Sequence, residues 1–188
     1  MICRLCPRNC GALRTGTGGN GYCRMPEVPV LARAALHYWE EPPISGTQGS
    51  GTIFFSGCSL GCVFCQNEKI SHQDFGKLVT RSRLRNICEE LVEQGAHNLN
   101  FVNPTHYAHA VAALLEDYRP AVPVVWNSGG YDKAETLRGL EGKVDVYLPD
   151  LKYLDEETAH RCSAAPGYPE IATAAIREMV RQIGRAHV

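Results

Sequence analysis

The chain has 188 residues, of which 44% are apolar and 21% charged, as is usual for a soluble globular protein with one buried core. The net charge of −1 argues against a broad basic face for nucleic acid, so we expect no nucleic-acid partner. No apolar run approaches the roughly 18 residues that a membrane helix needs, and no apolar signal segment follows Met1. We therefore expect no membrane contact and a cytoplasmic location.

Residues 1–50 are rich in Gly and Pro and predict a loop-like extension with little regular structure. From residue 51 onward, strands alternate with helices. The predicted strands are 52–56, 99–102, 122–126 and 144–148. The predicted helices are one capped by Ser82 and ended by Gly95, one capped by Asn103 that reaches Leu115, one near 133–140, and one that carries Ala172, Ala175, Ile176 and Met179.

This alternation predicts βαβ units and a parallel sheet in an α/β fold. In such sheets, functional residues gather at the carboxyl ends of the strands. The segment Cys58–Cys65 directly follows the first predicted strand and therefore falls where a site is expected.

Cysteine is the unusual component, with nine residues in a chain without an export signal. An odd number excludes a fully paired disulfide framework, and clustered thiols in a reducing compartment favour metal binding or redox chemistry. Four cysteines precede residue 24, three lie between residues 58 and 65, and two stand alone. In chain order they are Cys3, Cys6, Cys10, Cys23, Cys58, Cys62, Cys65, Cys88 and Cys162.

The central group has the spacing Cys-x3-Cys-x2-Cys on a short loop that contains Gly61. Three thiolates can hold a [4Fe–4S] cluster and leave one iron open to a small molecule. A closed zinc site would want a fourth ligand, so half of a zinc site or an unligated loop is the alternative.

Cys58-x3-Cys62-x-Phe64-Cys65 after a buried strand resembles the radical S-adenosylmethionine superfamily. The resemblance implies that these three cysteines are the catalytic cluster ligands and that Phe64 lies against the adenine of S-adenosylmethionine. It also implies reductive cleavage of that cofactor to a 5′-deoxyadenosyl radical, which abstracts hydrogen from a substrate. An electron donor such as flavodoxin or ferredoxin is then an expected partner.

Asp150-Leu151-Lys152 after the fourth strand resembles pyruvate formate-lyase activating enzymes, and several other stretches match an uncharacterised branch related to them. The resemblance implies cofactor contacts for Asp150 and Lys152 and a glycyl residue of a partner protein as substrate. Where the activases carry a Gly-Gly-Glu type motif, this chain has Asn103 and Thr105, which we predict as replacement contacts. Asn127 and Ser128 follow the third strand and are further candidates, with a plain turn as the alternative.

Cys3, Cys6, Cys10 and Cys23 supply enough thiols for a closed second site. Zinc and a second iron–sulfur cluster both fit the sequence, and unligated thiols are the alternative. We predict that Cys88 is a buried inert thiol on its helix. His106 and His109 share a helix face near the proposed site, where solvated or capping roles are expected.

The resemblance implies a (β/α) barrel of the radical S-adenosylmethionine type, and the sequence supplies about four of its βα units. We therefore predict a metal-binding extension at 1–50 and an incomplete, truncated core at 51–182. Residues 183–188 can be read from a common sequencing adapter, and we interpret them as an artefact. The rival functions are a non-catalytic iron–sulfur electron carrier and a zinc-stabilised interaction module.

Overall fold

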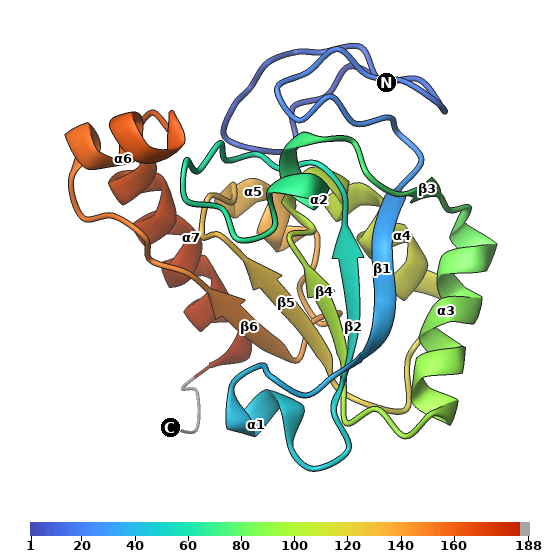
Figure 1. Cartoon of the computed structure of the whole chain (residues 1–188). Coiled ribbons are helices and arrows are strands. Elements are labelled where there is room, and N and C mark those ends of the chain that lie inside the picture. The colour runs from blue at the N-terminus through green and yellow to red at the C-terminus, as the bar shows by residue number, and fades with distance from the viewer. Residues whose placement is uncertain (185–188) are drawn as a thin grey trace.

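The computed structural model describes residues 1–184, so most of the predicted adapter-derived tail lies outside the described residues. One six-stranded sheet runs through the molecule in the order β3-β1-β2-β4-β5-β6 (Figure 1). The strands are β1 Val30–His37, β2 Ser50–Phe55, β3 Lys77–Leu78, β4 Leu99–Val102, β5 Val124–Ser128 and β6 Val146–Pro149. The helices are α1 Pro42–Ser45, α2 Glu68–His72, α3 Arg81–Glu93, the 3-10 helix η1 Thr105–Tyr107, α4 Ala108–Asp117, α5 Ala134–Arg138, α6 Glu156–Ser163 and α7 Tyr168–Ile183.

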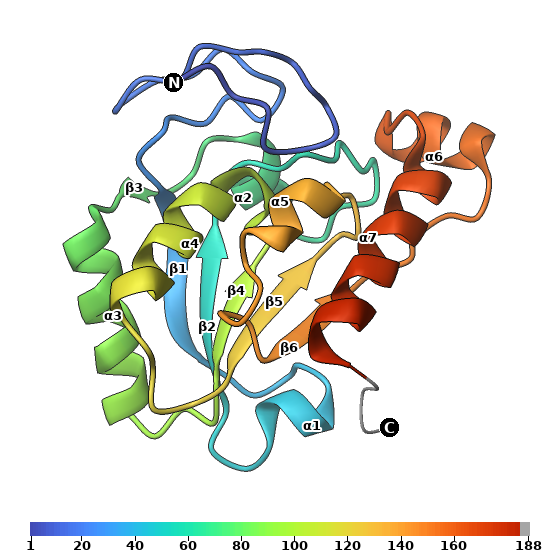
Figure 2. The ribbon, with the colours of Figure 1, turned by 180° about the vertical axis from the view of Figure 1, so that it is seen from behind.

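Strands β2, β4, β5 and β6 are parallel, as the alternation of strands and helices predicts. Their register pairs Ile53 with Phe101 and Phe101 with Trp126. Helices α3, α4, α5 and α7 cover one face of this sheet, which is the near face in Figure 2. The fold is therefore α/β, with an open sheet rather than a closed barrel.

The prediction that residues 1–50 are loop-like is wrong for Val30–His37. This segment forms β1 and pairs antiparallel with β2, which makes the sheet mixed. It has eight residues without Gly or Pro, and its Val30 and Leu31 are buried. The short strand β3 pairs with β1 through Leu78 and Lys77 and was also missed.

The core lies between the sheet and its helices. Ile53, Phe101 and Trp126 are fully buried on the side that faces Leu84 and Val111. At about 25 cal/mol per Å² of apolar surface removed from water, each large side chain contributes about 2 kcal/mol. This packing fixes which side chains point to the opposite face of the sheet, because neighbours along a strand alternate.

Two predicted helix starts were misplaced. Helix α3 is capped by Thr80, whose hydroxyl accepts the Arg83 amide at 3.2 Å, rather than by Ser82. Asn103 does not cap a helix, because it lies in the left-handed region at φ +54 and the chain continues as η1. The Asn103 side chain turns toward the loop after β2 instead.

Candidate functional site

One cavity of about 670 Å³ lies at the carboxyl ends of the four parallel strands and is also lined by residues of β1. Its volume is in the range of small-molecule sites. Residues from every parallel strand end and from β1 line it: Arg33, His37, Trp39, Glu40, Phe54, Phe55, Cys58, Leu60, Cys62, Phe64, Cys65, Gln66, Asn67, Ile70, Ser71, Val102, Asn103, Asn127, Ser128, Gly129, Asp150 and Lys152.

The cavity brings together the three central cysteines and all but one of the predicted cofactor contacts. The exception is Thr105, which is buried beneath the site and donates its hydroxyl to Asp132 Oδ1 at 2.7 Å. The prediction that Thr105 contacts a cofactor is therefore wrong. Its neighbour Asn103 is the residue of this segment that reaches the cavity.

The loop after β2 begins with a sharp turn at Gly57, which has φ +75. A Cβ at Gly57 would lie 2.3 Å from Met25 Cγ, so the close approach of the N-terminal segment also requires glycine. The Asn103 side-chain amide donates to Gly57 O at 2.7 Å. Together these contacts fix where Cys58 leaves the strand.

The rest of the loop is fastened to the end of α6. The Gly61 amide donates to Ser163 O at 3.2 Å, and the Val63 amide donates to Cys162 O at 2.9 Å. Sequence reasoning did not anticipate this link, because Cys162 and Ser163 lie far along the chain and carry no recognisable motif. The central cysteines are thus held by segments from both ends of the sequence.

Each central thiol has a polar neighbour. The Leu60 amide donates to Cys58 Sγ at 3.3 Å, and the Ser163 hydroxyl donates to Cys62 Sγ at 2.9 Å. Cys65 Sγ and Ser71 Oγ lie 3.2 Å apart. Burial raises the pKa of the Cys58 thiol to about 12, and the neighbouring Cys62 and Cys65 add to the rise. A bound cation would offset both effects, because metals bind the thiolate form.

These residues fit an iron–sulfur cluster. Three thiols face one cavity, and hydrogen-bond donors reach the sulfur of two of them, as donors do at cluster ligands. Among the described residues, no three His, Cys, Asp or Glu side chains converge closely enough to hold a single metal ion. The donor set is the soft thiolate set that clusters prefer.

The strand ends add charge and polarity. Asp150 follows β6, and its carboxylate accepts from Lys152 Nζ at 2.5 Å. Glu40 approaches from β1, and burial together with the neighbouring Glu41 raises its pKa. Phe64 is 55% exposed and meets Tyr153 edge to face, with ring centroids 6.4 Å apart. The cavity therefore offers an aromatic face, acceptors and the Lys152 cation.

Arg33 and His37 also line the cavity and were missed by sequence reasoning. Both belong to β1, which the Gly- and Pro-rich flanks led us to treat as loop. The signal that could have found them is the uninterrupted run from Val30 to His37. Trp39 lies at the cavity too and is 90% exposed.

The predicted roles of His106 and Cys88 have different outcomes. His106 is fully buried, and its Nε2 lies 2.7 Å from Ser56 O, so a solvated or capping role is wrong. Burial, with a smaller contribution from the nearby Arg14, lowers the pKa of His106 to about 3. Cys88 is fully buried and packs in the core, as predicted.

The four N-terminal cysteines lie in a segment above the strand ends, drawn in dark blue in Figure 1. Cys3 and Cys6 are buried, Cys23 is half-buried and Cys10 is exposed. Burial raises the pKa of Cys6 to about 11, and the neighbouring Cys23, Cys3 and Cys10 contribute to the rise. All nine cysteines are free thiols in this structure.

Residues 45–161 match the model of a family described as a 4Fe-4S single cluster domain. The match includes the three central cysteines and excludes the four N-terminal ones. The chain is also 34% identical over 177 residues to the uncharacterized protein MJ0674 of Methanocaldococcus jannaschii. That alignment covers 90% of this chain and 51% of the relative, so the chain spans about half the relative's length.

Among the described residues, no helix is long and apolar enough to cross a membrane.

Proposed function

Because the chain belongs to the family of 4Fe-4S single cluster domains, we propose that it is the cluster-binding part of a radical S-adenosylmethionine enzyme. The observation that carries the proposal is the cavity at the strand ends. Three cysteines line it, and no fourth cysteine is among its lining residues within 1–184. When bound, the cluster supplies the electron that cleaves S-adenosylmethionine to methionine and a 5′-deoxyadenosyl radical.

The cavity's own residues suit the parts of that cofactor. Phe64 presents an exposed aromatic face for adenine. Asn103 and Asn127 offer amide donors and acceptors near the cysteine loop. The Lys152 ammonium beside Asp150 provides a paired charge that suits a zwitterionic amino acid group.

The test is anaerobic reconstitution with iron and sulfide, followed by reduction and electron paramagnetic resonance with and without S-adenosylmethionine. We expect the cofactor to change the signal and 5′-deoxyadenosine to form. Cys62→Ser should abolish both, whereas Cys162→Ser, the same change at a cysteine outside the cavity, should retain both. A signal that S-adenosylmethionine leaves unchanged in the wild-type protein contradicts the proposal.

A second candidate function is a non-catalytic iron–sulfur electron carrier, favoured by the family description, which names only a single 4Fe-4S cluster. In that case S-adenosylmethionine leaves the spectrum of the cluster unchanged and no 5′-deoxyadenosine forms. A zinc-stabilised module would bind zinc and remain colourless.

The substrate proposal goes further than the cofactor. From the resemblance of Asp150-Leu151-Lys152 to the activating enzymes, we propose hydrogen abstraction from a glycyl Cα of a partner protein, with flavodoxin or ferredoxin as electron donor. The hydrogen passes to the 5′-deoxyadenosyl radical, which gives 5′-deoxyadenosine and a glycyl radical. Transfer of deuterium from a glycine-deuterated partner to 5′-deoxyadenosine tests this step, and its absence contradicts the activase role alone.

A further inference from the structure

Arg14 is a buried cation without an acidic partner. Its side chain is 1% exposed. The guanidinium donates from Nε to Pro26 O at 3.0 Å and from Nη1 to His106 O at 2.6 Å, and it lies over the Tyr107 ring with Cζ 4.9 Å from the centroid. None of the ion pairs formed by residues 1–184 includes Arg14. A buried charge whose partners are all neutral is costly, so this position calls for a nearby anion.

Sulfur is the group that can supply this anion. Arg14 Nη1 points at Cys3 Sγ at 3.6 Å, which places the guanidinium beside a thiol. Cys3 and Cys6 are 5% and 7% exposed, so their thiols lie within the same dry layer. The thiols become anions only if something stabilises the thiolate form.

Backbone amides are already directed at two further sulfurs of the group. The Arg8 amide donates to Cys6, and the Met25 amide donates to Cys23. In each case the donor lies two residues after the cysteine, as the Leu60 amide does for Cys58 in the central group. Donors at this position stabilise thiolates that bind a metal.

We propose that Cys3, Cys6, Cys10 and Cys23 bind a second metal centre and that Arg14 is its buried counter-cation. The four thiols do not converge on a single metal ion, so we assign the larger [4Fe–4S] cluster, which in its 2+ state has a net charge of about −2 with four thiolates. Arg14 offsets part of that charge from the protein side. The site lies outside residues 45–161 and is independent of the proposed function.

The second centre would brace the central cysteine loop. Arg8 Nε donates to Ser59 O at 2.7 Å. Tyr22 Oη stands 2.3 Å from where a Cβ at Gly61 would lie, so its hydroxyl packs directly on the loop. A segment with almost no regular structure thus covers the site, and a metal would give it rigidity.

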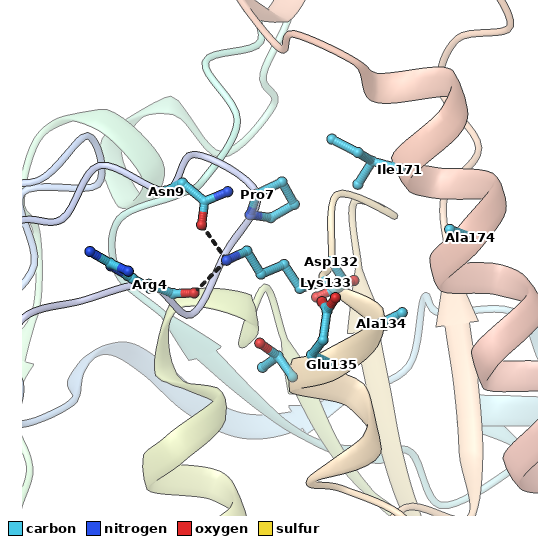
Figure 3. Close-up of a pocket in the computed structure, with 10 residues that line it drawn as sticks. Arg4, Pro7, Asn9, Asp132, Lys133, Ala134, Glu135, Ile171 and Ala174 are labelled. Carbon is cyan, nitrogen blue, oxygen red and sulfur yellow. Dashed lines mark hydrogen bonds between the residues drawn. The ribbon is translucent and has the colours of Figure 1, made fainter.

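The other side of this segment is fastened to α5. Lys133 Nζ donates to Arg4 O at 2.8 Å and also to Asn9 Oδ1 (Figure 3). This bond crosses a second cavity of about 520 Å³ that Pro7 and Glu135 also line. Arg14 is not among the residues that line this cavity, so the cavity is not an anion site for Arg14.

The first experiment locates the metal. The full chain and a C58S/C62S/C65S variant are purified anaerobically and assayed for iron, zinc and acid-labile sulfide. The variant should retain about four irons with sulfide, whereas zinc without iron overturns the assignment of a cluster. If the variant fails to fold, the wild-type protein decides the matter. About four irons and no further metal in the wild type, or no metal in a folded variant, overturns the second site.

The second experiment tests Arg14 through the rate of metal loss from the N-terminal site to a chelator. Arg14→Met should lose metal at least about tenfold faster than Arg119→Met, a control at an exposed arginine. Arg14→Lys, which retains the charge but loses the guanidinium fork, should fall between them and replaces Arg14→Met if that variant does not fold. Equal rates for the Arg14 and Arg119 variants overturn the counter-cation role.

A third measurement separates charge compensation from ordinary packing. Metal removal should lower the melting temperature of the wild-type protein more than that of Arg14→Met, because only the wild type is left with an uncompensated buried cation. If Arg14 were merely structural, metal removal would lower both melting temperatures equally, and that result overturns the proposal.

Discussion

Protonation of His106 should make the protein acid-sensitive in a way that can be calculated. Burial and the nearby Arg14 lower the pKa of His106 from 6.5 to about 3. Below pH 6.5 the unfolded chain binds a proton that the folded chain does not, so stability falls as pH decreases toward 3. Between pH 7 and pH 5 the loss from this one group is about 2 kcal/mol.

The assay is equilibrium urea unfolding of the metal-free protein at pH 7 and pH 5, with His106→Gln as the test variant. Gln can place its amide where His106 Nε2 meets Ser56 O, but it does not titrate. The wild-type protein should lose about 2 kcal/mol more than the variant over this interval. The control His160→Asn removes an exposed histidine and should behave as the wild type does. Equal pH dependence in the wild type and His106→Gln would refute the reasoning.

Three further changes have defined outcomes. Gly57→Ala should lower the free energy of unfolding by about 2 kcal/mol or more, whereas Gly95→Ala, at φ +91 with nothing within 4 Å, should cost about 1 kcal/mol; thermal unfolding compares them. Burial raises the pKa of Asp132, so stability falls as pH rises from 3.8 toward the raised pKa. Urea unfolding at a series of pH values from 4 to 8 should show that Asp132→Asn reduces this fall. Ser163→Ala removes the hydrogen bond to Cys62 Sγ, which is worth about 1 kcal/mol. Because this bond stabilises the reduced cluster, its loss should lower the reduction potential by about 40 mV in a redox titration. An unchanged potential contradicts a role for this bond.

The central strands could be predicted because their sequences are simple. Leu99–Val102 has three apolar residues out of four, and the strand was predicted with its observed bounds. Trp126 and Phe101 are fully buried because parallel strands covered by helices are apolar along most of their length. The site lies at the carboxyl ends of the strands, which could be predicted because parallel sheets place their sites there.

β1 could not be predicted on the same grounds. Its sequence, Val30–His37, alternates weakly and sits among Gly and Pro residues that favour loops. What makes it a strand is pairing with β2, whose edge would otherwise carry unpaired backbone groups. That is a tertiary cause, and the placement of Arg33 and His37 on the cavity wall depends on it.

Thr105 shows a different limit. A polar residue after a parallel strand is a reasonable cofactor contact, yet the left-handed turn at Asn103 rotates the chain so that Thr105 points inward. The Thr105 hydroxyl then donates a hydrogen bond to the buried side chain of Asp132. Only the backbone conformation at Asn103 distinguishes these outcomes, and a single non-glycine residue with positive φ leaves little trace in sequence.

The cysteine spacing is necessary for the central site but does not by itself explain its geometry. The loop has almost no regular structure of its own between β2 and α2. Its shape depends on backbone bonds to the end of α6, on the Asn103 amide at Gly57 O and on the packing of Tyr22 against Gly61. These three contacts come from different parts of the chain, so the site forms only once the whole sheet and the N-terminal segment have assembled.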